Sequence, residues 1–191
     1  MSGFAPRRCR WRPIRAAVVA SVAVAAVLGA AGCGPQEAAQ FEQPECRADT
    51  ATMVLMAQAI PTATLLPCIR ALPTGWSFNS LDVHNGTASF WLDNDRAGTK
   101  ALGISLRSTC MPSGTPAPSD KPGSQLYVKI DSLSPRFSGT RFYRFPQECL
   151  IYEFSFPTED RAFFTTDATN AIGFVTRAQV RRFVARYGFT L

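Results

Sequence analysis

The stretch LDVHNGTASFWL, residues 81–92, decides the fold because apolar residues alternate on both sides of Asn85-Gly86. Leu81 and Val83 precede this pair, and apolar residues follow it at the same spacing of two: Ala88, Phe90 and Leu92. An Asn-Gly pair between alternating segments is typical of a two-residue type I′ turn, which requires positive φ at both positions. The sequence therefore predicts an antiparallel β-hairpin, and with it an antiparallel sheet.

The same alternation recurs downstream of the hairpin. It predicts further strands in four segments: 102–106, 126–130, 141–145 and 150–156. A loop rich in proline and glycine, residues 111–124, separates the first of these segments from the second. With the hairpin this makes about six short strands, which we expect to be joined as an antiparallel meander.

Helix signals flank the strands on both sides. Asp49 is a suitable N-cap and Pro61 a stop, which predicts a helix over 49–60. A second short helical piece, interrupted by Pro67, is expected over Thr62–Leu72. Thr176 can cap a C-terminal amphipathic helix that ends before Gly188, with an apolar stripe formed by Val180, Phe183, Val184 and Tyr187. The predicted fold class is α+β, with a single globular domain over residues 45–191.

The N-terminal segment has the features of an export signal. Residues 16–31 are all Ala, Val, Leu, Gly or Ser, and five arginines precede them: Arg7, Arg8, Arg10, Arg12 and Arg15. A positively charged start followed by an apolar core is typical of export signals. We therefore expect residues 1–32 to form a signal helix.

Small residues directly precede Cys33. Ala30, Ala31 and Gly32 before this cysteine resemble the lipobox of bacterial lipoproteins, in which leucine usually stands at the position of Ala30. The resemblance implies cleavage after Gly32 and diacylglycerol on the Cys33 sulfur, with residues 33–44 as a polar tether. The protein would then lie on the extracytoplasmic face of the cell membrane. The alternative is an uncleaved signal anchor, because residues 16–36 are 21 uncharged residues, enough to cross a bilayer.

Charge is divided unevenly at Cys33. The formal charge of +6 includes five basic residues before that position and no acidic one. The remainder of the chain carries fifteen Lys and Arg against fourteen Asp and Glu, so it is close to neutral. The basic excess belongs to the export signal, in which positive residues stay on the cytoplasmic side. A nucleic-acid partner is therefore not expected.

Cysteine usage indicates disulfides. Cys9 lies in the signal and Cys33 would be lipidated, which leaves an even number of cysteines in an oxidising compartment: Cys46, Cys68, Cys110 and Cys149. Four cysteines allow three pairings, and we favour Cys46–Cys68 and Cys110–Cys149 because each joins elements adjacent in sequence. The competing interpretations are Cys68 as a nucleophile and a cysteine metal site. No CxxC motif supports a metal site, so no metal or cofactor is expected.

A second resemblance covers most of the exported part. The segments PTATLLPCIRALPTGWSF (61–78), WLDNDRAG (91–98) and GFVTRAQVRRFVARYGFTL (173–191) resemble small cell-envelope proteins of high-GC Gram-positive bacteria. This resemblance implies an envelope location and transfers no catalytic residue or ligand.

Two segments invite a catalytic or metal-binding interpretation. His84 is the only histidine and precedes the hairpin turn, where side chains are usually solvated, and the chain has no GxSxG or SxxK motif. Residues 93–98 partly match the start of a calcium loop, but Ala97 and Ile104 stand at its fifth and twelfth positions. We therefore expect a surface histidine and an ordinary turn between strands, in which Gly98 takes a positive φ.

Two sets of residues could form binding surfaces. The first lies on the C-terminal helix opposite its apolar stripe, and is either a solvated face or a contact with lipid headgroups: Arg177, Arg181, Arg182 and Arg186. The second either forms the two faces of the sheet or lines a lipid or glycan groove: Phe137, Phe142, Tyr143, Phe145, Tyr152, Phe154, Phe156, Phe163 and Phe164.

These observations favour a non-enzymatic lipoprotein whose domain binds or scaffolds a protein, lipid or glycan of the envelope. The alternatives are an envelope hydrolase and a carrier of an apolar ligand. A cleft that joins His84 to a carboxylate and a serine or cysteine would favour the hydrolase. An enclosed apolar cavity would favour the carrier.

Overall fold

The predicted hairpin begins the larger of two sheets in residues 42–191, the part of the chain that the computed structural model describes. β2 (Trp76–His84) pairs antiparallel with β3 (Thr87–Asn94), as predicted. The turn is not type I′, because Gly86 has a φ of 84° whereas Asn85 is outside the positive region. The Gly86 amide donates to the Ala59 carbonyl, 2.7 Å away, so neighbouring structure as well as strand twist determines this turn.

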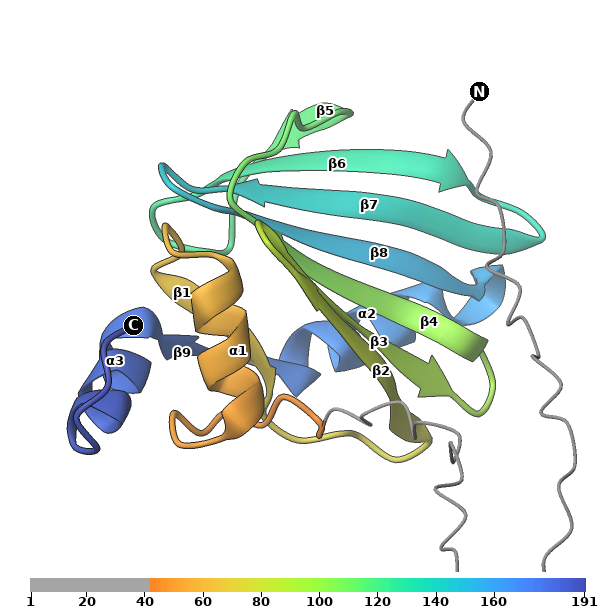
Figure 1. Cartoon of the computed structure of the whole chain (residues 1–191). Helices are drawn as coiled ribbons and strands as arrows, with labels where there is room; N and C mark the ends of the chain where they lie inside the picture. Colours follow the sequence, from red (N-terminus) through yellow and green to blue (C-terminus); the bar gives the residue numbers. More distant parts are fainter. Residues whose placement is uncertain (1–41) are drawn as a thin grey trace, which may run out of the picture. The chain divides into compact units, whose positions relative to one another are not determined.

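The larger sheet has seven strands in the order β2-β3-β4-β8-β7-β6-β5 (Figure 1). The further strands are β4 (Gly98–Arg107), β5 (Thr115–Ala117), β6 (Gln125–Ser132), β7 (Arg136–Arg144) and β8 (Cys149–Pro157). The predicted single meander is wrong at one point, because two meanders, β2–β4 and β5–β8, join side by side through β4 and β8. The loop that starts at residue 111 carries the chain to the far edge of the sheet, where β5 lies.

A second, two-stranded sheet corrects the prediction for residues 62–72. These residues contain β1 (Leu65–Ile69), not a helical piece, and β1 pairs antiparallel with β9 (Ile172–Thr176). Pro67 is accepted in β1 because this strand has a full partner on one side only. The partner is more than a hundred residues away, so local signals could not reveal the pairing. The nine strands exceed the roughly six predicted, although the α+β class is correct.

Three α-helices accompany the sheets. α1 (Ala51–Ala59) begins after Thr50, one residue beyond the predicted cap, and the Thr50 hydroxyl accepts from the Met53 amide. α3 (Arg177–Ala185) has the predicted cap, Thr176, which forms a reciprocal capping box with Gln179. α2 (Arg161–Ala171) follows a short 3₁₀ turn, η1 (Thr158–Asp160), and was not predicted. Within residues 42–191 none of these helices has the length and hydropathy needed to cross a bilayer.

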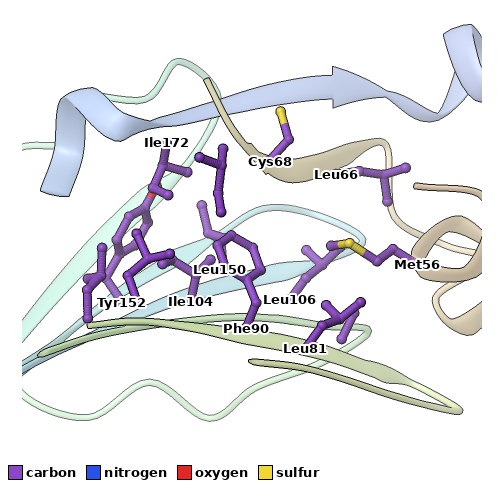
Figure 2. Close-up of a cluster of buried hydrophobic side chains, with 14 of the residues drawn as sticks. Met56, Leu66, Cys68, Leu81, Phe90, Ile104, Leu106, Leu150, Tyr152 and Ile172 are labelled. Carbon is purple, nitrogen blue, oxygen red and sulfur yellow. The ribbon is translucent and has the colours of Figure 1, made fainter. Parts of the chain in front are cut away.

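The core lies between one face of the larger sheet and the layer formed by α1, β1 and β9 (Figure 2). Phe90, Ile104 and Tyr152 are directly opposite one another on adjacent strands, and we call the face that they share the inner face. Met56, Leu66 and Ile172 cover this face from the opposite layer. Met53, on the same helix as Met56, is also completely buried, so both methionines belong to the core.

The two disulfides have the pairing favoured from the sequence. Cys46 bonds to Cys68 with their Cα atoms 4.9 Å apart, and Cys110 bonds to Cys149 with a separation of 5.8 Å. The first fixes the start of the domain to β1, and the second links the segment after β4 to the start of β8, where the two meanders meet. Both bridges therefore reinforce joints between layers or meanders.

A buried carboxylate connects the two sheets. Glu148, in the turn between β7 and β8, is 3% exposed. Its oxygens accept hydrogen bonds from the Thr64 hydroxyl at 2.9 Å, from the Thr64 amide and from the Leu65 amide. This side chain thus fixes the start of β1 against the end of the larger sheet.

The predicted signal peptide (1–32), the lipidation site Cys33 and most of the tether lie outside the described residues. The last tether residues, 42–44, lie against the domain. The Pro44 carbonyl accepts from the Ile69 amide at 2.7 Å, and the Glu42 carbonyl accepts from the Thr52 hydroxyl at 3.0 Å. The segment next to the domain is therefore held by backbone hydrogen bonds.

Candidate functional site

A groove lies between α2 and the inner face of β6, β7 and β8. Its volume is about 470 Å³ and it is open to solvent along one side. We call it the wing groove, after the β5–β7 part of the larger sheet, which we call the wing. It is lined by Val128, Lys129, Ile130, Phe137, Gly139, Thr140, Arg141, Phe154, Arg161, Ala162, Thr165 and Thr166.

Strand alternation places an apolar floor in the wing groove. Ile130, Gly139 and Phe154 are opposite one another on β6, β7 and β8, and they share the inner face. A Cβ atom at position 139 would lie 2.7 Å from the Lys129 carbonyl oxygen, so a side chain there would force the strands to shift. Gly139 therefore allows β6 and β7 to approach closely, with the end of the Phe137 ring 3.5 Å from the position that a Cβ atom would take. Ile130, beside it on β6, is 55% exposed.

Arg141 occupies the next position of the inner face. It lies opposite Val128 on one side and Tyr152 on the other, in the row that continues through Ile104 to Phe90. The guanidinium carbon is 5.5 Å from the centre of the Phe154 ring, which is the geometry of a cation–π contact. A half-buried cation thus stands where the apolar row of the core would otherwise continue.

The wall opposite the sheet is the first half of α2. Arg161 and Ala162 lie in its first turn, and Thr165 and Thr166 follow. The Thr165 and Thr166 hydroxyls donate to the carbonyls of Arg161 and Ala162, at 2.7 and 3.0 Å. Because these hydroxyl protons are already engaged within the helix, the guanidinium groups are the strongest donors that face the groove.

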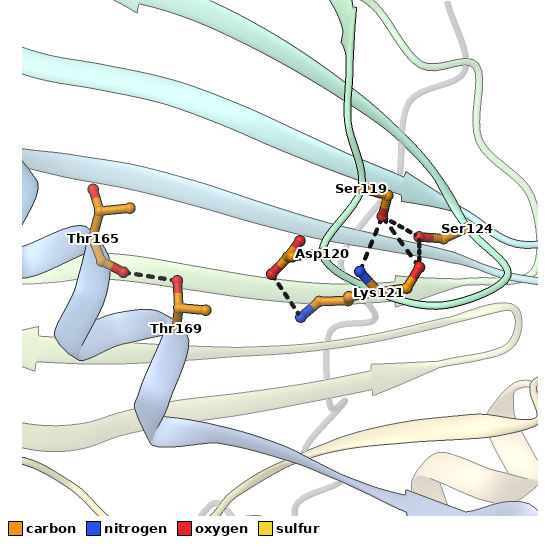
Figure 3. A network of polar contacts seen from close by, with 6 residues as sticks. All are labelled: Ser119, Asp120, Lys121, Ser124, Thr165 and Thr169. Atoms are coloured by element: carbon orange, nitrogen blue, oxygen red, sulfur yellow. Dashed lines mark hydrogen bonds and ion pairs between the residues drawn. The ribbon is translucent and has the colours of Figure 1, made fainter.

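A loop over residues 118–124 covers the inner face next to the wing groove (Figure 3). The Ser119 and Ser124 hydroxyl oxygens lie 2.7 Å apart, and they lie 3.2 and 2.8 Å from the Lys121 carbonyl oxygen. The hydrogen bonds that these groups share close the loop. The Lys121 ammonium lies 4.8, 5.6 and 5.3 Å from the ring centres of Tyr143, Tyr152 and Phe174, and 3.8 Å from the Asp120 carboxylate. The loop therefore ties the wing to β9 through one lysine in an aromatic cage.

Burial is the main cause of the pKa shifts of Lys121, Tyr143 and Tyr152 in this cage. It lowers the pKa of Lys121, and it raises the pKa of Tyr143 to about 12, with a further increase from the neighbouring Asp120. Burial also raises the pKa of Tyr152, whose hydroxyl is buried with no hydrogen-bond partner among the described residues. These phenols are therefore neutral at physiological pH.

His84 is on the surface, as predicted. Its side chain is 73% exposed, and its Nε2 atom lies 2.8 Å from an oxygen of the exposed Asp82. The shallow depression beside it is lined by Leu55, Gln58, Ala59, Val83 and Asn85, without a serine or cysteine. The structure therefore does not bring His84 and a nucleophile together within residues 42–191.

Residues 93–98 form the expected turn between strands. The Asn94 side chain accepts from the amides of Arg96 and Ala97, both at 3.0 Å, and Gly98 has a φ of 93°. The Asp93 carboxylate accepts from the Lys100 amide at 2.7 Å. In residues 42–191 no cluster of three or more His, Cys, Asp or Glu side chains could hold a metal ion.

The arginines of α3 do not form one surface, which corrects the prediction. Arg181, Arg182 and Arg186 are exposed, but Arg177 is half-buried and donates to the carbonyls of Ala57 and Ile60 at the end of α1. Its role is to satisfy those helix-terminal acceptors. Tyr187, placed in the apolar stripe, is 67% exposed because α3 ends at Ala185.

The nine aromatic residues from Phe137 to Phe164 also occupy different environments instead of one groove or face. Most of its members belong to the core or are half-buried around it, Phe163 is exposed, and Phe137 and Phe154 line the wing groove. The sequence analysis did not single out Arg141, Arg161 or the α2 threonines. The spacing of two from Gly139 to Arg141 and Tyr143 was the available signal for Arg141, but its meaning depends on the pairing with Tyr152.

No protein-family model, curated protein or solved structure matches this chain. The function is therefore inferred from the residues of the site and from the motifs in the sequence.

Proposed function

We propose that this protein is a lipoprotein on the outer face of the cell membrane whose domain binds a ligand in the wing groove without transforming it. One observation carries the binding role. The inner face of the wing is largely apolar, and it is uncovered where it lines the groove, with Ile130 55% exposed. Exposed apolar surface bounded by polar residues is typical of binding sites.

The volume of the groove supports a small molecule or one segment of a larger one. At about 470 Å³ it falls within the range of roughly 300–1,000 Å³ that is usual for ligand sites. Because the groove is open along one side, it favours a surface-binding domain over a carrier that encloses its ligand. The exposed position of His84 disfavours the hydrolase.

The anchor is tested by replacing Cys33 with Ala in the full-length precursor. If Cys33 carries diacylglycerol, the variant loses metabolic labelling by fatty acid and keeps Met1–Gly32, whereas the unmodified protein begins at a lipidated Cys33. Intact mass spectrometry measures both features. An unmodified protein that keeps Met1–Gly32 and carries no lipid would contradict the anchor and support the signal-anchor alternative.

Binding in the groove is tested in living cells with a photo-crosslinking residue, p-benzoylphenylalanine. Placed at Ala162, which lines the groove, it should form an adduct of defined mass with a small molecule of the envelope. The matched control carries the same residue at Asn170, which is exposed on the same helix and does not line the groove. Equal adducts at both positions, or none at Ala162, would overturn the binding role of the groove.

A further inference from the structure

We propose that the wing groove takes an anionic lipid, with its alkyl chain on the floor and its head group between Arg141 and Arg161. This inference rests on the proposed function, because it names the ligand class of the same groove. The reason is the combination of two guanidinium groups with an apolar floor in one opening.

Arg141 is a half-buried cation on the inner face of the sheet. A cation on the inner face loses part of its hydration, and this loss is offset when an anion takes the place of the missing water. None of the ion pairs formed within residues 42–191 includes Arg141. Its contact with the Phe154 ring holds the guanidinium at the groove. The guanidinium also lies within hydrogen-bonding reach of the Tyr143 hydroxyl, which can engage only part of its five N–H donors and leaves others for an anion.

Arg161 is the second cation, and it lies on the opposite wall of the groove. It lies in the first turn of α2, where the partial positive charge of the helix terminus disfavours a cation. An anion at this end of the groove would relieve that repulsion and receive hydrogen bonds from Arg161. The ion pairs within the described residues omit Arg161 as well.

Three of the nearby acidic side chains are engaged with other cations, whereas Glu159, in the turn before α2, belongs to none of the ion pairs within the described residues. Asp160 pairs with Arg96 at 3.3 Å, Asp120 with Lys121 at 3.8 Å, and Asp131 with Lys129 at 2.5 Å. The last pair also removes Lys129 as a free cation of the groove. Among the cations that line the groove, Arg141 and Arg161 are therefore the two that none of the ion pairs within the described residues includes.

The apolar floor distinguishes a lipid from a small inorganic anion. Val128, Ile130 and Phe154 offer a path for an alkyl chain, and each methylene buried there would add to the affinity. The Phe137 ring, which ends 3.5 Å from the position that a Cβ atom of Gly139 would take, adds to this apolar surface. A phosphate ion alone would use the arginines and leave the floor exposed to water.

The test compares three ten-carbon amphiphiles with different head groups: decyl phosphate, decyltrimethylammonium and decyl maltoside. Each is added below its micelle concentration to the full protein in phosphatidylcholine nanodiscs. Amide hydrogen exchange of β6 and α2 measures binding. We expect decyl phosphate to slow exchange in both elements at concentrations at least about tenfold below those of the other two, since one charged hydrogen bond contributes roughly 1.5–3 kcal/mol.

Arg141→Gln should weaken decyl phosphate binding about tenfold or more and leave decyl maltoside binding unchanged. The matched control is Arg144→Gln, an exposed arginine of the same strand that does not line the groove, which should have no effect. Equal affinity for the three head groups, or equal effects of the two variants, would overturn the inference. If the Ala162 adducts nevertheless form, the binding role stands and only the anionic head group is excluded. If they are absent too, both proposals fail.

Discussion

The inner face has two halves, one on β2–β4 and one on the wing. Side chains alternate between the two faces of the sheet in the same way in both halves, but they differ in exposure to solvent. Phe90 and Ile104, on β3 and β4, are completely buried, whereas Ile130 on β6 is 55% exposed. The difference comes from the covering layer, since α1 packs on β2 and β3 while α2 packs on β8 and β9. The part of the wing around Ile130 is left exposed, whereas Tyr143 and Leu126, next to the 118–124 loop, are buried. Alternation therefore determines which side chains share a face, and long-range packing determines whether those side chains are buried in the core or exposed to solvent.

Truncating one apolar side chain in each half should give the largest contrast. We expect Phe90→Ala to lower the free energy of unfolding by about 3–5 kcal/mol, because it leaves a cavity in the core. Ile130→Ala should cost less than about 1 kcal/mol, because that side chain is already largely hydrated. Urea unfolding measures both values. Similar costs for the two variants would mean that the wing is covered in solution.

The covered half also depends on the joint between the sheets. Glu148→Gln replaces one acceptor oxygen with an NH₂ donor that faces the donors of Thr64 and Leu65. We expect a loss of about 2–3 kcal/mol in the free energy of unfolding, and faster amide exchange in β1 and β9 than in the wing.

The control for this joint is Gln147→Ala, because Gln147 is the exposed neighbour of Glu148 and should contribute within about 0.5 kcal/mol. Exchange that accelerates equally in all strands would show that Glu148 stabilises the whole domain rather than the joint.

The features of the fold that depend on neighbouring residues could be predicted from the sequence. The Asn85-Gly86 hairpin, the Thr176 cap and the alternation of the main strands follow from neighbouring residues, and the cysteine pairs follow from the order of the elements. β1, β9 and the join of β4 with β8 depend on partners far along the chain.

The groove was hidden from the sequence for the same reason. The face on which Arg141 lies becomes evident only when its pairing with Tyr152 is known. α2 contains three threonines, and its two phenylalanines are adjacent rather than spaced along one helical face.

We expect the Tyr143 phenol in the aromatic cage around Lys121 to affect stability at alkaline pH. The pKa of Tyr143 is about 12 in the folded protein, against 10.0 for an ordinary tyrosine. Between these values the unfolded chain loses the phenolic proton while the folded protein keeps it, so stability falls as the pH rises through this interval. Tyr143→Phe should make the decline shallower, as measured by urea unfolding across the interval.

Two residues bear on the interpretation of this titration. Lys121 lies in the same cage, and burial lowers its pKa below the ordinary value of 10.5. Below pH 10.5 the unfolded chain keeps this proton more readily than the folded protein, so the Lys121 contribution to stability increases with pH up to that value. Tyr127→Phe, at a half-buried position outside the cage, provides the matched substitution. An unchanged alkaline decline in Tyr143→Phe would mean that Tyr143 ionises freely in the folded state.

The smallest effect is expected at the tip of the first hairpin. The His84 and Asp82 side chains are 73% and 51% exposed, and an ion pair so hydrated contributes little to stability. His84→Ala should therefore change the free energy of unfolding by no more than about 0.5 kcal/mol. Gly86→Val should cost more, because a β-branched residue resists the φ of 84° and because the Gly86 amide holds this turn to α1.

His84→Ala also tests the non-enzymatic role directly. A surface histidine with no nucleophile beside it has no catalytic constellation to support, so the folded variant should retain the cellular role of the protein. Loss of that role in a variant of normal stability would make His84 functional and move the active surface from the wing groove to the edge of the covered half. The same measurement on Arg141→Gln, which changes the groove and leaves the hairpin intact, then identifies which half of the sheet acts on the ligand.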